Sequence, residues 1–150
     1  MTTTQHIPPV LTNPLASLID TESMPWDGEG SGNAMKVLWV SEETGAWIAL
    51  IKSAAGQVNP PHVHLGPADF FVLSGRLEYR GGVAGPGAYV REPAGAVHDA
   101  TTTPVETIYL ANVQGPIAFF GPDGAISHVS TGEQIRARWQ AARERAGVTG

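Results

Sequence analysis

The stretch PPHVHLGPADFF, residues 60–71, decides how the rest of the chain is read. It places two of the five histidines, His62 and His64, one residue apart in a segment that has the pattern of a β-strand. Because side chains at positions i and i+2 of a strand point to the same face, both imidazoles would face one spot. This spacing suits a metal ion, and it equally fits two buried histidines that are satisfied by ordinary hydrogen bonds.

Short segments rich in Val, Ile, Trp and Phe surround this stretch, with turn residues between them. From Met35 onward they read KVLWVS, AWIALIK, DFFVL, RLEYR, TIYLANV, PIAFF and AISHV. Eighteen glycines and twelve prolines are spread along the chain, as expected for many short strands that are joined by tight turns. The pattern predicts an all-β fold, an antiparallel sandwich or barrel. We expect its core to contain the aromatic residues Trp39, Trp47, Phe70, Phe71, Tyr109 and Phe119.

The length of 150 residues predicts one domain with three parts. Residues 1–34 lack a sustained period and read as an irregular N-terminal arm packed on the domain, and residues 35–130 form the β-structure. Residues 131–147 read as a C-terminal helix of the same domain, because Thr131 and Gln134 have the spacing of a capping box. The arginines of this helix read as a solvated surface.

Composition excludes several classes of function. The chain has no cysteine, so a disulfide scaffold, a thiolate metal site and a cysteine nucleophile are excluded. A net charge of −5 offers no basic face for nucleic acid. No apolar run approaches the roughly 20 residues of a membrane span, and the N-terminus does not read as a signal peptide. We therefore expect a soluble cytoplasmic protein without nucleic-acid or membrane partners.

A second segment, GAYVREPAGAVH at residues 87–98, supplies a third histidine, His98. Its pattern is a glycine, five residues, Pro-x-Gly, two residues and the histidine. Together with Gly56, His62-x-His64 and Gly75, this segment resembles the paired signature motifs of the cupin superfamily. The resemblance implies a single-domain jelly-roll β-barrel in which the two motifs come together.

Two positions depart from the usual cupin motifs. The first motif normally has a glutamate four residues after its second histidine, where this chain has Ala68. The asparagine that often follows the final histidine is replaced by Thr102. Without the glutamate, three neutral imidazoles would leave the full double positive charge on a bound divalent ion.

From about residue 35 to the C-terminus, the chain resembles the three-histidine cupins that cleave acetylacetone and 2,4'-dihydroxyacetophenone. The resemblance implies that His62, His64 and His98 bind Fe²⁺. It also implies a small ketone substrate that binds the metal as its enolate, and O2 as the second substrate in cleaving a carbon–carbon bond. Cupins commonly form dimers, so we expect a homodimer to which the N-terminal arm contributes.

Other functions fit the same ligands. Imidazoles also accept Zn²⁺ or Ni²⁺, so the protein could be an isomerase or hydrolase that acts through a Lewis acid. It could also be a non-enzymatic cupin that binds a small molecule. Asp69 is a candidate catalytic residue, as a replacement ligand, a hydrogen-bond acceptor behind a histidine or a general base, and it also fits a solvent-facing position. His6 and His128 read as surface or core-edge residues.

Overall fold

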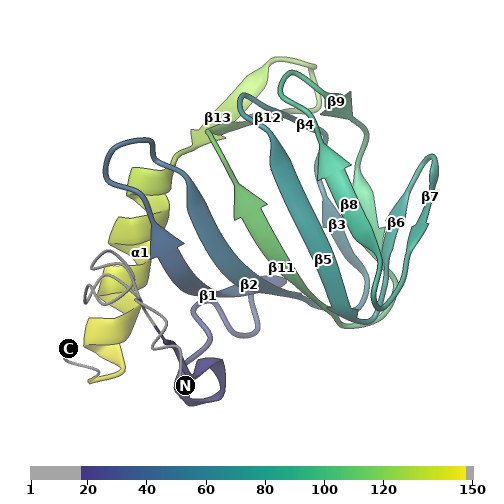
Figure 1. The fold of residues 1–150 in the computed structure, drawn as a ribbon. Helices are drawn as coiled ribbons and strands as arrows, with labels where there is room; N and C mark the ends of the chain where they lie inside the picture. The colour runs from purple at the N-terminus through teal and green to yellow at the C-terminus, as the bar shows by residue number, and fades with distance from the viewer. Residues whose placement is uncertain (1–17, 148–150) are drawn as a thin grey trace, which may run out of the picture.

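The computed structural model describes residues 18–147, and these form an antiparallel β-structure with one long helix (Figure 1). The part before the first strand contains a short 3₁₀ helix, Thr21–Ser23. The strands are β1 (Asn33–Val40), β2 (Trp47–Ser53), β3 (Gln57–Asn59), β4 (His62–His64), β5 (Ala68–Ser74), β6 (Leu77–Tyr79), β7 (Gly82–Ala84), β8 (Tyr89–Glu92), β9 (Val97–His98), β10 (Thr101–Thr103), β11 (Thr107–Val113), β12 (Ile117–Phe120) and β13 (Ile126–Ser130), and the helix is α1 (Gly132–Arg145).

The strands form three sheets. The largest has the order β1-β2-β11-β5-β8, and its strands run side by side across the front of Figure 1. The other two have the orders β3-β10-β6-β7 and β13-β12-β4-β9. Neighbouring strands are antiparallel throughout the described residues, and most are far apart in sequence. The predicted all-β cupin architecture with a C-terminal helix is confirmed.

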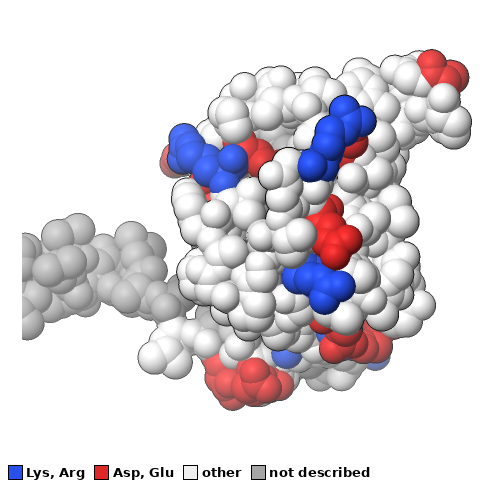
Figure 2. Space-filling view, turned by 90° about the vertical axis from the view of Figure 1, so that its right-hand side faces the viewer, with Lys and Arg blue, Asp and Glu red and all other residues white. Residues whose placement is uncertain are grey.

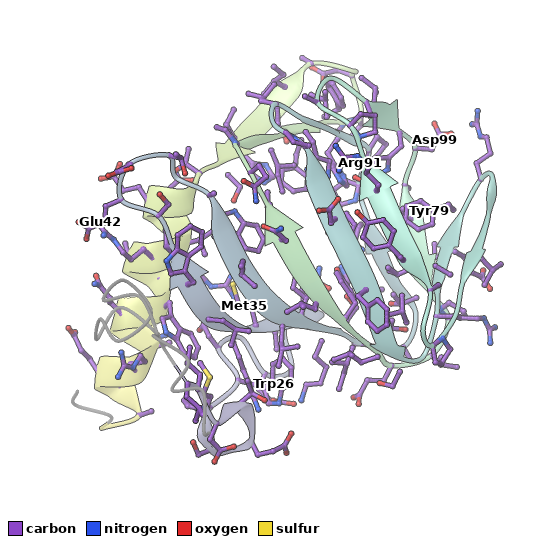
Figure 3. The ribbon with its side chains drawn as sticks, in the orientation of Figure 1. Trp26, Met35, Glu42, Tyr79, Arg91 and Asp99 are labelled. Atoms are coloured by element: carbon purple, nitrogen blue, oxygen red, sulfur yellow. The ribbon has the colours of Figure 1, made fainter. Side chains whose placement is uncertain are left out.

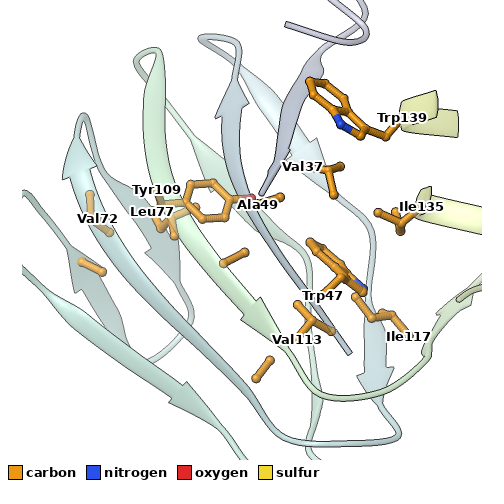
Figure 4. Close-up of a cluster of buried hydrophobic side chains, with 13 residues drawn as sticks. Val37, Trp47, Ala49, Val72, Leu77, Tyr109, Val113, Ile117, Ile135 and Trp139 are labelled. Atoms are coloured by element: carbon orange, nitrogen blue, oxygen red, sulfur yellow. The ribbon is translucent and has the colours of Figure 1, made fainter. Parts of the chain in front are cut away.

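The hydrophobic core lies between the largest sheet and the elements that cover it. Strand β11 alternates strictly between buried and half-buried residues, so its buried side chains point into the barrel. Trp47 and Tyr109 are buried as expected, and Phe70 and Phe119 pack against the core. The other side chains of the core cluster are shown in Figure 4.

Two aromatic residues do not belong to this core. Trp39 is 51% exposed and Phe71 is 42% exposed, so the expectation that both are core residues is wrong. A bulge between Val37 and Trp39 changes the register of β1 against β2. Phe71 follows the inward-facing Phe70 and therefore points to the opposite face of its strand.

Helix α1 closes one side of the barrel. Thr131 and Gln134 form the predicted capping box, in which the side chain of each residue bonds the backbone N–H of the other. Ile135 and Trp139 face Val37 and Trp47 (Figure 4). The helix thus buries an apolar stripe against the first two strands.

The segment before β1 is fixed to the barrel and to the helix. The backbones of Asp27 and Met35 exchange two hydrogen bonds of 2.9 Å. The buried Asp27 carboxylate also lies 2.6 Å from Nε of Arg138 on α1. Strand β1 begins at Asn33, and residues 1–17 of the expected N-terminal arm, including His6, lie outside the described residues.

Surface charges are paired locally. On the side shown in Figure 2, basic and acidic side chains lie near one another. Arg80 lies 2.6 Å from Asp99, and Arg76 lies 3.0 Å from Glu78. Within residues 18–147, no helix has the length and apolar character that a membrane crossing requires.

Candidate metal centre

The central strand β4 carries both histidines of the first motif into the barrel. His62 and His64 are buried and Val63 between them is only half-buried, which is the alternation predicted for this strand. On one side β4 pairs with β12, and on the other side it pairs with β9, where His98 is the direct partner of His62. Pairing of β4 with β9 therefore brings the third histidine to the first two.

The ring nitrogens of these histidines converge. The Nε2 atoms of His62 and His64 are 3.2 Å apart. The carboxylate of Glu92 lies among them, with its Oε2 atom 2.6 Å from Nε2 of His64 and 3.1 Å from Nε2 of His98. One potential ligand atom from each of the four residues lies within 4.8 Å of all the others.

The chemistry of these atoms fits a cation. Nδ1 of His62 lies 2.9 Å from the carbonyl oxygen of Pro60, and Nδ1 of His98 lies 2.9 Å from that of Asp99. Each Nδ1 must carry a proton to donate, which leaves Nε2 of the neutral ring as a lone-pair acceptor. When both rings are neutral, two acceptor nitrogens and a carboxylate face one another, an arrangement that needs a positive ion, and in the metal-free protein the Nε2 proton of His98 takes that place. The residues present fit a divalent metal.

Glu92 corrects the expectation of a site without a carboxylate. It lies on β8, directly opposite Ala68 of β5, which is the position where the usual cupin motif has its glutamate. Ala68 is 1% exposed and Glu92 is 7% exposed, so both side chains face the barrel interior. The small side chain of Ala68 leaves space into which the longer Glu92 reaches from the neighbouring strand. The position of Glu92 beside Pro-Ala-Gly, six residues before His98, was the available sequence signal.

Burial and mutual contacts shift the pKa values of the cluster in different directions. Desolvation lowers the pKa of His62 to about 4. Burial alone would raise the pKa of Glu92, but hydrogen bonds with His64 and His98 outweigh it and lower that pKa to about 2. The hydrogen bond with Glu92 raises the pKa of His98. Burial beside the Glu92 carboxylate raises the pKa of the Tyr79 hydroxyl, which therefore stays protonated and hydrogen-bonds Glu92.

The cluster opens into a cavity of about 370 Å³ inside the barrel. Apolar side chains that include Phe70, Leu77 and Ile117 form much of its wall. Helix α1 contributes to the opposite part of the wall through Gln134, Ile135 and Arg138. A buried polar cluster at one end of a largely apolar cavity is the usual form of a small-molecule site.

The structure does not bring Asp69 to this cluster. Asp69 follows the inward-facing Ala68 and points to the outer face of the largest sheet. There its carboxylate accepts a 2.8 Å hydrogen bond from the Tyr89 hydroxyl and lies 3.5 Å from Arg91. The expectation that Asp69 is a ligand, a base or a partner of a histidine is therefore corrected. Successive side chains of β5 point to opposite faces, and Asp69 takes the outer one.

His128 also lies outside the cluster. It is exposed on β13, as predicted, and its ring stacks on Phe119 with a centroid separation of 4.6 Å. The residue lines the wall of the cavity. A substitution of His128 is therefore a suitable control for substitutions of the cluster histidines.

Replacing His98 with alanine should weaken binding of a divalent ion by at least about 100-fold, because one of three imidazole ligands is lost. The fold should persist, since His98 lies at the end of a two-residue strand. Chelator competition measures the affinity, and thermal unfolding checks the fold. His128→Ala is the matched control and should leave affinity unchanged. A folded His98→Ala variant with wild-type affinity would remove His98 from the ligand set.

Metal binding near pH 6 should release about one proton per ion. In the metal-free protein the raised pKa of His98 keeps this ring largely protonated at that pH, and only the neutral ring can bind a metal. His62 and Glu92, with pKa values of about 4 and about 2, have no proton to release. Affinity should therefore rise with pH up to the pKa of His98.

Titration calorimetry in buffers with different ionisation enthalpies measures this release. The same titration repeated at increasing pH is the control, and the release should fall as the pH passes the pKa of His98. If no proton is released near pH 6, the claim that His98, the histidine with the raised pKa, binds the metal would be contradicted.

Comparisons with known proteins agree with this geometry. Residues 16–118 match a family model described as the ChrR cupin-like domain. The chain is 30% identical over 121 residues to the acetylacetone-cleaving enzyme of Acinetobacter johnsonii, which covers 77% of this chain and 79% of that enzyme.

Solved structures show the same relationship. The crystal structure of an acetylacetone dioxygenase from A. johnsonii is 30% identical with a TM-score of 0.68, covering 73% of this chain and 78% of that chain. A Methylibium petroleiphilum protein provisionally named an acetylacetone dioxygenase is 30% identical with a TM-score of 0.75, covering 83% and 94%. An RmlC-like cupin from Ralstonia eutropha, 21% identical with a TM-score of 0.80 over 89% and 90%, shares the fold. The chain belongs to the cupin superfamily, within the ChrR cupin-like domain family.

Proposed function

We propose that the protein is a non-heme Fe²⁺ dioxygenase that cleaves a carbon–carbon bond of a β-diketone or hydroxyketone. The observation that carries the proposal is the convergence of His62, His64, Glu92 and His98 at the end of an apolar cavity. The 30% identity to the acetylacetone-cleaving enzyme also supports the proposal. Both substrate classes share two oxygen atoms placed to chelate one metal ion.

When bound, Fe²⁺ would supply the Lewis acidity that favours an enolate and the electrons that react with O2. The chain's own residues would hold the ion and set its charge. Three neutral imidazoles and the Glu92 carboxylate would leave a single net positive charge on a site with a divalent ion. A singly charged enolate matches that charge, so its binding in the buried cavity would leave no net charge.

The cavity wall would keep water away from the reacting substrate. Phe70 lies beside His64, with ring centroids 6.0 Å apart, and Phe119 lies 5.1 Å from His62. These rings offer no hydrogen bond to water, and a dry site strengthens the attraction between a cation and an enolate. Tyr79 would keep Glu92 fixed, since its hydroxyl holds a proton and hydrogen-bonds the carboxylate.

The outer position of Asp69 bears on the alternative of a Zn²⁺ or Ni²⁺ isomerase or hydrolase. That chemistry needs a general base beside the substrate, and Asp69 was the predicted base. Its carboxylate instead binds Tyr89 on the outer sheet face. The dioxygenase needs no such base if the substrate enters as its enolate. A non-enzymatic binding role differs from both by the absence of turnover.

Protein reconstituted with Fe²⁺ should consume O2 in the presence of a β-diketone or a hydroxyacetophenone and release two carbonyl products. Oxygen uptake and product analysis over a panel of both classes measure this. The zinc-loaded protein and iron-treated His98→Ala are the controls, and both should be inactive. No uptake with any member of the panel by the iron-loaded wild type would refute the dioxygenase. Isomerised or hydrolysed products in the zinc or nickel form would establish the alternative.

We also propose that the protein forms a homodimer through the outer face of its largest sheet. Leu50, Leu110, Phe71 and Tyr89 are neighbours in register across β2, β11, β5 and β8. Phe71 is 42% exposed and Tyr89 is 61% exposed. A row of apolar side chains of this kind, bordered by Asp69 and Arg91, can pack on a second copy of itself through a two-fold axis.

Light scattering should give twice the mass of one chain for the wild type and the mass of one chain for Phe71→Lys, because a buried lysine at the centre of the interface would be desolvated without a partner. Val83→Lys is the control, since Val83 is 64% exposed on β7 of another sheet. A monomeric wild type, or a Phe71→Lys variant that remains a dimer, would contradict this interface.

A further inference from the structure

The cavity continues well beyond the metal cluster. Its wall includes Met35 of β1 and Tyr79 of β6, which lie in different parts of the molecule in Figure 3. A volume of about 370 Å³ corresponds to about a dozen water molecules at roughly 30 Å³ each. A compact diketone such as acetylacetone would occupy only the end beside the histidines. The remaining space fits a substrate with a tail.

Part of the cavity wall contains a directed chain of hydrogen bonds. The Ser53 hydroxyl donates to Oδ1 of Asn33 over 2.6 Å. Nδ2 of Asn33 donates to Oδ1 of Asn59 over 2.9 Å. Nδ2 of Asn59 donates to the Thr101 hydroxyl oxygen over 3.3 Å. Four strands, β1, β2, β3 and β10, are joined in this way.

The direction of the chain determines what it can still bind. Each asparagine amide has two N–H hydrogens and uses one of them in the chain, and the Thr101 hydroxyl accepts from Asn59. Among residues 18–147, the remaining N–H groups of Asn33 and Asn59 and the O–H of Thr101 have no acceptor. All three residues line the cavity, and Thr101 is 4% exposed. This part of the wall therefore offers three donors that no protein group uses.

The charge of the tail follows from its surroundings. Arg138, the cation on the cavity wall, is neutralised by the Asp27 carboxylate at 2.6 Å. A divalent ion, Glu92 and an enolate sum to zero, so a charged tail would leave an uncompensated charge in a buried cavity. A neutral oxygen satisfies the free donors without adding charge.

We propose that the preferred substrate is a β-diketone or hydroxyketone whose tail carries a neutral oxygen acceptor, a carbonyl or ether oxygen, bound by Asn33, Asn59 and Thr101. This inference rests on the proposed function for the choice of chelating group. The metal cluster holds the chelating end, and the donor wall selects the tail. Diketones that bind the metal through the same chelating group should therefore differ in affinity according to the chemistry of their tails.

The experiment uses the zinc-loaded wild-type protein, in which binding is measured without turnover. The probes are an alkyl-tailed β-diketone and the ether in which one tail methylene is replaced by oxygen, with the oxygen position varied along the tail. A third probe ends in a carboxylate. Because one net hydrogen bond changes affinity by about three- to tenfold, the best ether should bind at least about threefold tighter than the alkane analogue. The carboxylate should bind more weakly than the ether.

Two variants test the wall itself. Thr101→Val keeps the shape and removes the hydroxyl donor, and Asn59→Leu removes the donor amide without adding a charge. Both should reduce the ether preference to about onefold while retaining zinc affinity and affinity for the alkyl diketone. Thr102→Val is the matched control, because Thr102 alternates away from the cavity wall on β10, and it should keep the preference. Thermal unfolding checks each fold.

The outcomes separate this inference from the proposed function. Ether, alkane and carboxylate probes that bind equally to the zinc form would overturn the inference, even if the iron form consumes O2 with all of them. A preference that persists in both Thr101→Val and Asn59→Leu would also overturn it. An ether preference that the variants abolish, in a protein whose iron form consumes no O2, would support the donor wall and refute the dioxygenase.

Discussion

The convergence of imidazole nitrogens and a carboxylate inside the barrel is the constraint on which the structure depends. Burying acceptors face to face is unfavourable unless a cation or shared protons lie between them. The backbone carbonyls of Pro60 and Asp99 fix the ring tautomers that produce this convergence. Pairing of β4 with β9 fixes the distance. A positively charged ion thus makes the contact between the histidine nitrogens and the carboxylate favourable.

The carboxylate of this chain enters the barrel from a different strand than the glutamate of the usual cupin motif would. Ala68 and Glu92 are partners across two antiparallel strands, and their side chains enter the same part of the interior. A glutamate at either position would reach the histidines only if its partner were small, because the interior is close-packed. The exchange preserves one negative charge beside three imidazoles, and the single remaining positive charge of a divalent site then suits a singly charged ligand.

Patterns local in the sequence predicted much of this structure. The alternation HVH predicted that His62 and His64 share a face, and Thr131 with Gln134 predicted where α1 begins. The predictions that were wrong concerned features that depend on strand pairing, and on which face of the sheet a residue takes after a loop. Asp69 is separated from His64 by a Gly-Pro turn, so its face could not be deduced, and Glu92 became part of the site only through pairing of β8 with β5. Trp39 lies outside the core, next to a bulge in β1 that no pattern in the sequence predicts.

The two ends of the cavity are built from different parts of the chain. The metal end uses β4, β8 and β9, whereas Asn33 stands at the start of β1, where the preceding segment is held by the Asp27–Arg138 ion pair to α1. Substitutions at Asn33, Asn59 or Thr101 change no residue of the metal cluster and leave its pairing intact. A fold of this kind can therefore keep its metal end and change the tail that it accepts. In the proposed binding mode, the helix and the segment before β1 would act on specificity, because they hold the start of β1, where Asn33 stands.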